Sequence, residues 1–523
     1  MGFALKLRPE ASLILDPEGA RAKLKHTVLA HDLGLDAGAL TVVESLDGTR
    51  DFDAVVKIVD GKVDKQHVRM VVRSLFLLGF LEGSGDGPMA RMRELGSGAV
   101  KLDRVVLDGA RFQCQGSGEC CQNYLFGPLS EQDIARIEAL PVTEKMPWVG
   151  PGPYWKIIKR DDEDAKFLAN QADHPEVCVF RLDDHRCGLH AHFGVESKPN
   201  FCRTYPVEEW ATLDGIRTYD KGSCASFARS ARSGPPIIDD LVRLRPLMAQ
   251  RFEISHPVVQ TELVSFDFWF HARLQRSLLE LINANLGTPA STLQVVGRAY
   301  HSALQALAAC PFEAGAPETL VEELATRPPL PFYEPSSDPI EVSHGTTVLA
   351  TICTRLLERG ARRLAERQEE GEHPLSQPLG RELMQLLHLL RVAALARDGA
   401  MDDPYIAELL AVPIFGADCD EVLRLSLRQQ LFGPRMFIED RPVPALLRMA
   451  VIMALTVIGG RMHAAADGQP FVRADDLSRP HMLAQRVLDQ LGGREIVLEF
   501  EADTWAVLEA LPSVLSFGDL PEA

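Results

Sequence analysis

The chain has 523 residues, of which 46% are hydrophobic and 24% are charged. This composition is typical of an ordinary globular protein, and the length predicts about three domains rather than one. Acidic residues outnumber basic residues by 73 to 55, for a formal net charge of -18. The chain therefore repels phosphate backbones, and nucleic acid is not an expected partner.

Neither the first ten residues nor the longest apolar run of the sequence predicts a membrane segment. Residues 1–10 contain no apolar stretch of signal-peptide length, and the longest apolar run, residues 449–458, is too short to span a bilayer. We therefore expect a cytoplasmic protein with no membrane partner. In that reducing compartment, clustered cysteines indicate metal or redox chemistry rather than disulfides.

Residues 1–82 are expected to form a small domain of their own. Residues 39–43 are apolar and partly β-branched, residues 46–49 predict a turn, and residues 52–58 have helical spacing. A second helical pattern follows in Val68, Val71, Val72, Leu75 and Leu78.

Within this segment, the sequence L-D-G-T-R followed by V-x-x-V-V-x-x-L-x-x-x-G-F-L resembles PqqD-like winged-helix domains. The resemblance implies three helices with a short sheet, and a domain that holds a peptide substrate by adding it as a strand to an exposed sheet edge. We expect that edge at residues 40–43. A winged helix used only for dimerisation or packing is the alternative.

The rest of the chain is expected to divide into a cysteine-rich domain, residues 100–232, and a helical domain, residues 237–523, with a possible break at the proline-rich residues 326–341. A Gly-Ser-Gly-Asp-Gly-Pro linker, residues 83–88, precedes them. Helical spacing recurs in residues 258–286, 346–367, 375–397 and 444–458. The predicted fold class is mainly α (α+β), with a winged-helix-like N-terminal domain, a loop-rich cysteine-cluster metal domain and a helical C-terminal half.

Seven of the ten cysteines gather in the middle segment, as Cys114, Cys120, Cys121, Cys178, Cys187, Cys202 and Cys224. Thiolates select zinc, Cu(I) or iron-sulfur clusters, and four thiolates from separate loops can close a tetrahedral site. All seven are therefore candidate metal ligands. The isolated Cys310, Cys353 and Cys419 are interpreted instead as small core or loop residues that bind no metal.

The spacing also predicts local structure around these cysteines. Adjacent residues of an extended chain point to opposite faces, so we expect one of Cys120 and Cys121 to bind metal while the other packs or serves a second centre. Cys178 and Cys187 are expected to meet across a hairpin. Histidine nitrogens could add ligands, but we interpret the nearby histidines as surface or hydrogen-bonded residues, namely His185, His190 and His192.

The pattern F-x-C-x-x-S-G-x-C-C at residues 112–121, followed by Cys-Val-Phe at 178–180, Cys-Gly-Leu at 187–189 and Lys-Pro-x-x-Cys-Arg-x-Tyr-Pro at 198–206, resembles the YkgJ-type cysteine-cluster family, described as zinc- or iron-chelating. Flagellin lysine-N-methylase is similar to that family. The resemblance implies an iron-sulfur cluster (4Fe-4S) or zinc as cofactor. The family often has cysteine where this chain has Ser117, which removes one candidate ligand, and arginine where it has Lys198.

Three functions are compatible with the sequence. The first is modification of a protein or peptide, such as S-adenosylmethionine-dependent lysine N-methylation, although no Rossmann methylase fingerprint and no C-x3-C-x2-C motif locates the methyl donor. The second is a non-enzymatic protein that stores, delivers or senses iron or zinc. The third is an interaction protein whose loop-rich middle domain is stabilised by structural zinc. Such a zinc site typically contributes about 10 kcal/mol to folding.

Overall fold

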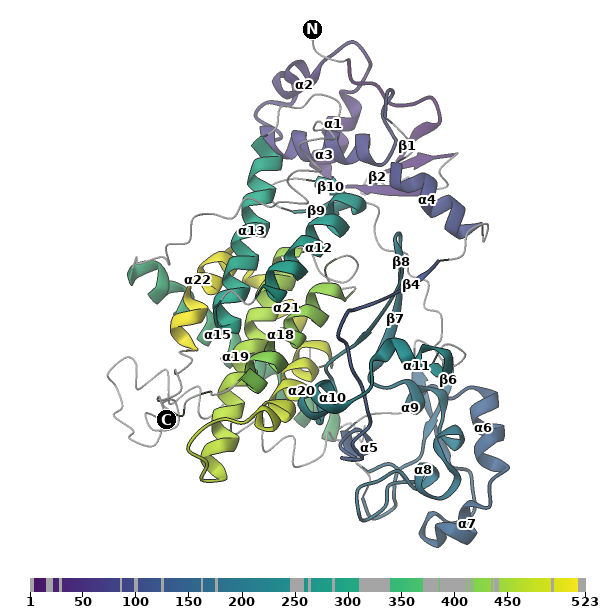
Figure 1. Cartoon of the computed structure of the whole chain (residues 1–523). Coiled ribbons are helices and arrows are strands. Elements are labelled where there is room, and N and C mark those ends of the chain that lie inside the picture. The colour runs from purple at the N-terminus through teal and green to yellow at the C-terminus, as the bar shows by residue number, and fades with distance from the viewer. Residues whose placement is uncertain are drawn as a thin grey trace.

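Helices make up most of the structure, and the strands form small sheets beside them (Figure 1). The mainly α (α+β) class is confirmed. The computed structural model describes residues 4–515, with gaps at 16–21, 28–30, 85–86, 98–101, 124–126, 161–162, 175–176, 245–257, 262–264, 285–286, 310–338, 370–384, 386–411, 413, 415–416, 434–435, 437–441 and 491–492.

The chain begins with a three-stranded antiparallel sheet and three helices. The strands lie in the order β1 (Ala11–Leu15), β2 (Ala22–His26) and β3 (His31–Leu35), and the helices are α1 (Ala37–Glu44), α2 (Phe52–Val59) and α3 (Lys65–Leu77). As predicted, α3 turns its apolar face to the core of this unit: Val68, Val72, Leu75 and Leu78 are buried and Val71 is half-buried. The next helix, α4 (Gly87–Gly96), begins inside the segment that was predicted to be a flexible linker.

The predicted strand at residues 40–43 is wrong, because these residues lie in α1. Asp36 caps the helix, and its carboxylate accepts a hydrogen bond from the backbone nitrogen of Ala39 at 2.7 Å. Ala39, Val42 and Val43 are buried on one face at helical spacing. Burial of this face outweighs the strand preference of the β-branched residues. An exposed edge for a peptide must therefore be sought on β1 or β3, the outer strands of the sheet.

A second sheet joins the cysteine-rich segment to the helices. Its strands lie in the order β4 (Arg104–Val106), β8 (Gly215–Asp220) and β7 (Val207–Thr212), with β4 parallel and β7 antiparallel to β8. Trp210 and Tyr219 of this sheet belong to the same buried cluster as the C-terminal helices. Arg217 of β8 donates a hydrogen bond to the carbonyl of Phe432 at 3.1 Å. The strands on either side of the cysteines are thus fixed in the helical core.

Between β4 and β7 the chain forms short helices and one hairpin around a separate, smaller buried cluster. This part lies at the lower right of Figure 1, and its elements are α5 (Cys120–Asn123), α6 (Glu131–Glu138), α7 (Val142–Lys145), β5 (Trp155–Arg160), β6 (Glu163–Leu168), α8 (Gly188–Phe193) and α9 (Asn200–Thr204). Ile137, Met146 and Phe180 are buried at its centre. Cys178 belongs to this cluster, and four further cysteines pack against it, namely Cys120, Cys121, Cys187 and Cys202.

The remaining elements form the large helical core. They are α10 (Phe227–Ser233), α11 (Ile237–Leu244), β9 (Val258–Gln260), β10 (Ser265–Asp267), α12 (Phe268–Asn283), α13 (Pro289–Ala309), α15 (Pro339–Glu369), α18 (Ala417–Phe432), α19 (Pro442–Ala466), α20 (Ala474–Gln490), α21 (Gly493–Glu499) and α22 (Thr504–Val514). The helix expected from residue 258 starts only at Phe268, after the β9–β10 hairpin. All of the helix expected at 375–397 except residue 385, and most of the proline-rich break at 326–341, lie outside the described residues.

Among the described residues, one helix has the length and apolar composition to cross a membrane, and it is α19. The apolar part of α19 is wholly buried inside the structure. It packs most extensively along α20 and also contacts α22, so α19 is the central helix of the core.

Candidate metal centre

The first cysteine-bearing loop, residues 114–121, runs directly against the turn at His185. Gly118 has a φ of +65°, and a Cβ placed on it would lie 2.0 Å from the carbonyl oxygen of His185. Only glycine combines this backbone conformation with so close an approach. The loop ends in the short helix α5, which carries Cys120 and Cys121.

The second segment is a tight turn that presents Cys178 and Cys187. Arg181 pairs with Cys187 as an isolated antiparallel bridge, and the backbone nitrogen of Gly188 donates to the carbonyl of Phe180 at 2.7 Å. The backbone nitrogen of Cys178 in turn donates to the carbonyl of Cys121 at 2.7 Å. The expected hairpin is therefore present as a turn without regular strands, and it is bonded to the first cysteine-bearing segment.

The third segment, which carries Lys198 and Cys202, is held by the N-terminus of α6. Ser130 and Asp133 form the predicted capping box there. The Asp133 carboxylate also accepts from the backbone nitrogen of Asn200 at 3.0 Å and from Arg136 at 2.9 Å. Burial alone would raise the pKa of Asp133, but these hydrogen bonds together lower it below its ordinary value. The carboxylate is therefore ionised at neutral pH and fixes the start of α9.

These three segments enclose one cavity of about 350 Å³. Six of the seven candidate cysteines line it: Cys114, Cys120, Cys121, Cys178, Cys187 and Cys202. Cys114 is exposed, whereas Cys178 is buried and the other four are half-buried. Two of the three histidines, His185 and His190, also line the cavity.

Cys224, the seventh candidate, is not among the residues that line the cavity. Its sulfur accepts a hydrogen bond from the backbone nitrogen of Ser226 at 3.4 Å. Burial raises the pKa of the Cys224 thiol, and the charges of Cys120 and Asp220 raise it further. Cys224 is thus a neighbour of Cys120 that does not itself line the cavity.

The expectation that Cys120 and Cys121 point to opposite faces is wrong. Both residues line the cavity, and their sulfur atoms are 3.9 Å apart. The reason is that they lie in the helix α5, where adjacent side chains are separated by about 100° rather than the 180° of a strand. Two thiolates of one tetrahedral zinc, with bonds of about 2.3 Å, are about 3.8 Å apart. The spacing of this pair therefore suits two ligands of a single centre.

As the side chains stand, no three Cys, His, Asp or Glu residues in the described part of the chain converge tightly enough to hold an ion. The cysteine sulfur atoms therefore line one cavity, but they do not lie close enough together to form a closed coordination site. Which of the seven cysteines bind metal stays a prediction.

The thiols around the cavity differ in acidity. The hydrogen bond with Cys121 lowers the pKa of Cys120 to about 7, against the effect of burial, and the positive charges of Lys198 and Arg486 lower it further. Burial raises the pKa of Cys178 to about 12. Cys120 therefore has more thiolate character at neutral pH than Cys178, and a metal bound here would displace the proton of Cys178.

Lys198 places a positive charge among these thiols. Burial lowers its pKa, but the negative charges of Cys202, Cys187, Cys114 and Cys120 together raise it above the ordinary value. Among the residues that the structure describes, no carboxylate lies within ion-pair distance of its Nζ. A half-buried cation that faces thiols and has no acidic partner is suited to an anionic occupant of the cavity.

The carboxyl group of Asp220, close to Cys224, is expected to make the stability of the fold depend on pH. This group is fully buried, with Oδ1 accepting from the backbone nitrogen of Gly222 at 2.7 Å and Oδ2 without a hydrogen-bond partner among the described residues. Burial raises its pKa from 3.8 to about 7. Between these values the folded chain keeps a proton that the unfolded chain has lost, so this group makes the protein less stable as pH rises from 3.8 to about 7.

Replacing Asp220 with asparagine keeps the acceptor for Gly222 and removes the titration. We expect the Asp220→Asn variant to lose less stability than the wild type between pH 4 and pH 8, by on the order of a few kcal/mol. Urea unfolding of both proteins at the two pH values measures the difference. Equal losses in the two proteins would show that Asp220 is already ionised in the fold.

Two features of this site escaped the sequence-based prediction. Lys198 was noted only as a difference from the family pattern, although a basic residue within a cysteine motif is itself a signal of charge balance. Arg486 carries no local signal, because it lies on α20 in a distant part of the chain.

Comparisons with protein-family models, curated proteins and solved structures found no match for this chain. The resemblance to the YkgJ-type family and to PqqD-like domains therefore stands on the quoted motifs alone.

Proposed function

We propose that the cysteine cavity holds a metal-thiolate centre, with an iron-sulfur cluster as the favoured occupant and zinc as the alternative. The observation that carries the proposal is the combination of six thiols with a cation, Lys198, that has no carboxylate partner in the described part of the chain. Soft sulfur donors select these metals. Four thiolates leave such a centre with a net negative charge, which the cation offsets.

The size of the cavity favours a cluster over a single ion. A water molecule occupies about 30 Å³ of liquid, and a zinc ion closed by four thiolates needs little additional space. The cavity of about 350 Å³ exceeds that need several-fold. It suits a cluster of several iron and sulfide ions, or a metal together with a group from a partner molecule.

Candidate ligands for this centre are Cys120, Cys121, Cys178, Cys187 and Cys202, with Cys114 at the exposed rim and Cys224 behind the cavity. When bound, an iron-sulfur cluster supplies electron transfer or a Lewis-acidic iron. The chain's own residues hold the sulfur donors in place, limit the access of water and provide compensating positive charge.

We further propose that the centre serves the modification of a protein or peptide, such as lysine N-methylation with S-adenosylmethionine as donor. This step rests on the resemblance to flagellin lysine-N-methylase, and no residue is assigned to the donor. The exposed rim at Cys114 supports access by a partner side chain. A protein that only stores or senses metal, and one stapled by structural zinc, are the competing functions.

Metal analysis and absorption spectroscopy of anaerobically purified protein test the proposal. We expect iron with acid-labile sulfide and a broad brown absorption in the visible range. A colourless protein with stoichiometric zinc would favour the structural function. A protein that contains neither metal, and takes up neither on reconstitution, would refute the metal centre.

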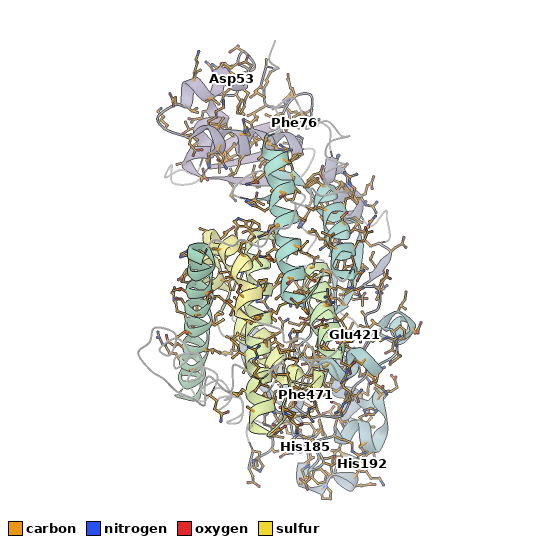
Figure 2. The ribbon with its side chains drawn as sticks, turned by 60° about the vertical axis from the view of Figure 1, so that its left-hand side comes forward. Asp53, Phe76, His185, His192, Glu421 and Phe471 are labelled. Atoms are coloured by element: carbon orange, nitrogen blue, oxygen red, sulfur yellow. The ribbon has the colours of Figure 1, made fainter. Side chains whose placement is uncertain are left out.

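We propose that a peptide partner pairs with β1, one of the two outer strands of the N-terminal sheet. Ile14 and Leu15 at the end of this strand are exposed, which supports an apolar contact beside the strand edge. Figure 2 labels Asp53 and Phe76 in this unit at one end of the molecule and His185 and His192 of the cysteine segment at the other. A peptide bound at β1 must therefore reach along the molecule to the cavity.

A charge on the β1 edge is expected to weaken this pairing. The variant is Ile14→Asp, and the matched control is Ile58→Asp on α2, since the two side chains are 46% and 53% exposed in the same unit. We expect at least a tenfold loss of partner protein retained from a lysate of the source cells by the first variant and none by the second, quantified by mass spectrometry. Equal retention by both variants would refute recruitment through β1.

A further inference from the structure

The helix α20 lies against two cysteine-bearing segments. Arg479 of α20 forms an ion pair with Glu119, the residue before Cys120, at 3.0 Å. Gly222, close to Cys224, has a φ of +72°, and a Cβ placed on it would lie 2.7 Å from Nε2 of His481. A helix from the C-terminal half therefore packs against the segments that carry Cys120 and Cys224, although none of its residues lines the cavity.

The helix α20 also carries a buried cation, Arg486. Arg486 follows Arg479 by seven residues, which is about two helical turns, so both side chains project from the same face of α20. The Arg486 side chain is only 1% exposed. Its charge and that of Lys198 both act on Cys120. The same thiol is thus approached by one cation from the cysteine segment and one from the C-terminal helices.

If the cavity holds a metal-thiolate centre, two cations near one of its thiols offset the negative charge of that centre. Burying a net negative charge is costly unless opposite charge lies nearby. Groups outside the ligand set also tune the affinity and the reduction potential of a metal centre. A cation that approaches from α20 stabilises the more negative, reduced form of a cluster more than the oxidised form.

We propose that Arg486 of α20, acting with Lys198, balances the negative charge of the metal-thiolate centre, so that the C-terminal helical half is a working part of the metal site. This inference rests on the proposed metal centre. Arg486 and Lys198 are charge-balancing residues in it and contact no substrate.

The test compares Arg486→Met and Arg486→Lys with the control Arg461→Met. Arg461 is also buried, lies on α19, donates to the carbonyl of Val412 at 3.0 Å and does not line the cysteine cavity. In anaerobic redox titrations, we expect Arg486→Met to shift the ratio of reduced to oxidised cluster about tenfold toward the oxidised form, equivalent to about 59 mV for one electron. Arg486→Lys and Arg461→Met should stay close to the wild type.

If the bound metal is zinc, the same variant should lose zinc to a competing chelator about tenfold more readily than the wild type. Lys198→Met provides an independent measurement should Arg486→Met fail to fold, and it should change both readouts in the same direction. The charge-balancing role would be overturned if Arg486→Met and Lys198→Met kept the wild-type reduction ratio and zinc retention. It would also be overturned if Arg461→Met shifted them as much as Arg486→Met. A wild-type protein that binds no metal would refute the metal centre itself, so the two failures are distinguishable.

Discussion

Replacing Cys178 with serine is expected to abolish metal retention, whereas replacing Cys353 with serine is expected to leave the metal content unchanged. The two cysteines are closely matched. Both are buried, and burial raises the pKa of each thiol to about 12. Only Cys178 lines the cysteine cavity, while Cys353 lies on α15 in the helical core. Both variants bury a serine hydroxyl group, but only Cys178→Ser removes a candidate metal ligand. The metal bound per chain is therefore measured for both after anaerobic purification, and a difference between them reports the ligand role of Cys178.

Loss of the metal should also lower stability, because a structural metal contributes on the order of 10 kcal/mol to folding. The thermal midpoint of Cys178→Ser should accordingly fall well below that of Cys353→Ser. A full metal content in Cys178→Ser, or an equal loss in both variants, would contradict the assignment of the cavity as the metal site. Cys419, likewise buried, offers a second control, whereas Cys310 lies outside the described residues.

Replacing Gly118 with alanine is expected to separate two of the segments that enclose the cavity. A Cβ at Gly118 would lie 2.0 Å from the carbonyl oxygen of His185, so the loop at 114–121 must move away from the turn. Gly468 is the matched control, because its φ of +63° is close to the +65° of Gly118 and a Cβ on it would meet nothing within 4 Å. Both variants lose roughly 1–2 kcal/mol to the left-handed backbone conformation.

Only Gly118→Ala carries the additional cost of overlap, about 1–3 kcal/mol, and only this variant displaces cysteines. We expect faster loss of metal to a chelator and a lower thermal midpoint than for Gly468→Ala. Chelator competition followed in the metal absorption band, together with thermal unfolding, measures both effects. Indistinguishable behaviour of the two variants would mean that the approach of Gly118 to His185 does not hold the cavity together.

Short-range signals in the sequence predicted local structure well. The capping box at Ser130 and Asp133 starts a helix, and the valines of α3 face the core, because both signals act within one or two turns of chain. The clustering of cysteines likewise pointed to one region, since residues of one chemical type rarely gather without a shared role. Six of the seven candidates line one cavity.

The predictions that failed depended on context that a short run of residues does not contain. Residues 40–43 contain enough β-branched side chains to favour a strand, but they form a helix because its apolar face is buried against α3. Cys120 and Cys121 were treated as extended chain, although they start a helical turn. The ion pair of Arg479 with Glu119 and the effect of the Arg486 charge on Cys120 depend on how distant helices pack, and no local pattern in the sequence predicts them.

The strands around the cysteine segment determine how that segment is connected to the rest of the protein. Val106 pairs with Thr218 of β8, and Thr218 pairs with Glu209 of β7, so the chain leaves β4 and enters β7 at the same end of the sheet. Residues 107–206 are thus topologically an insertion between β4 and β7, the two outer strands of one sheet. The entropic cost of closing such an excursion grows only slowly with its length. Its ligands and loops can consequently diversify during evolution while the helical scaffold that anchors it keeps its own sequence constraints.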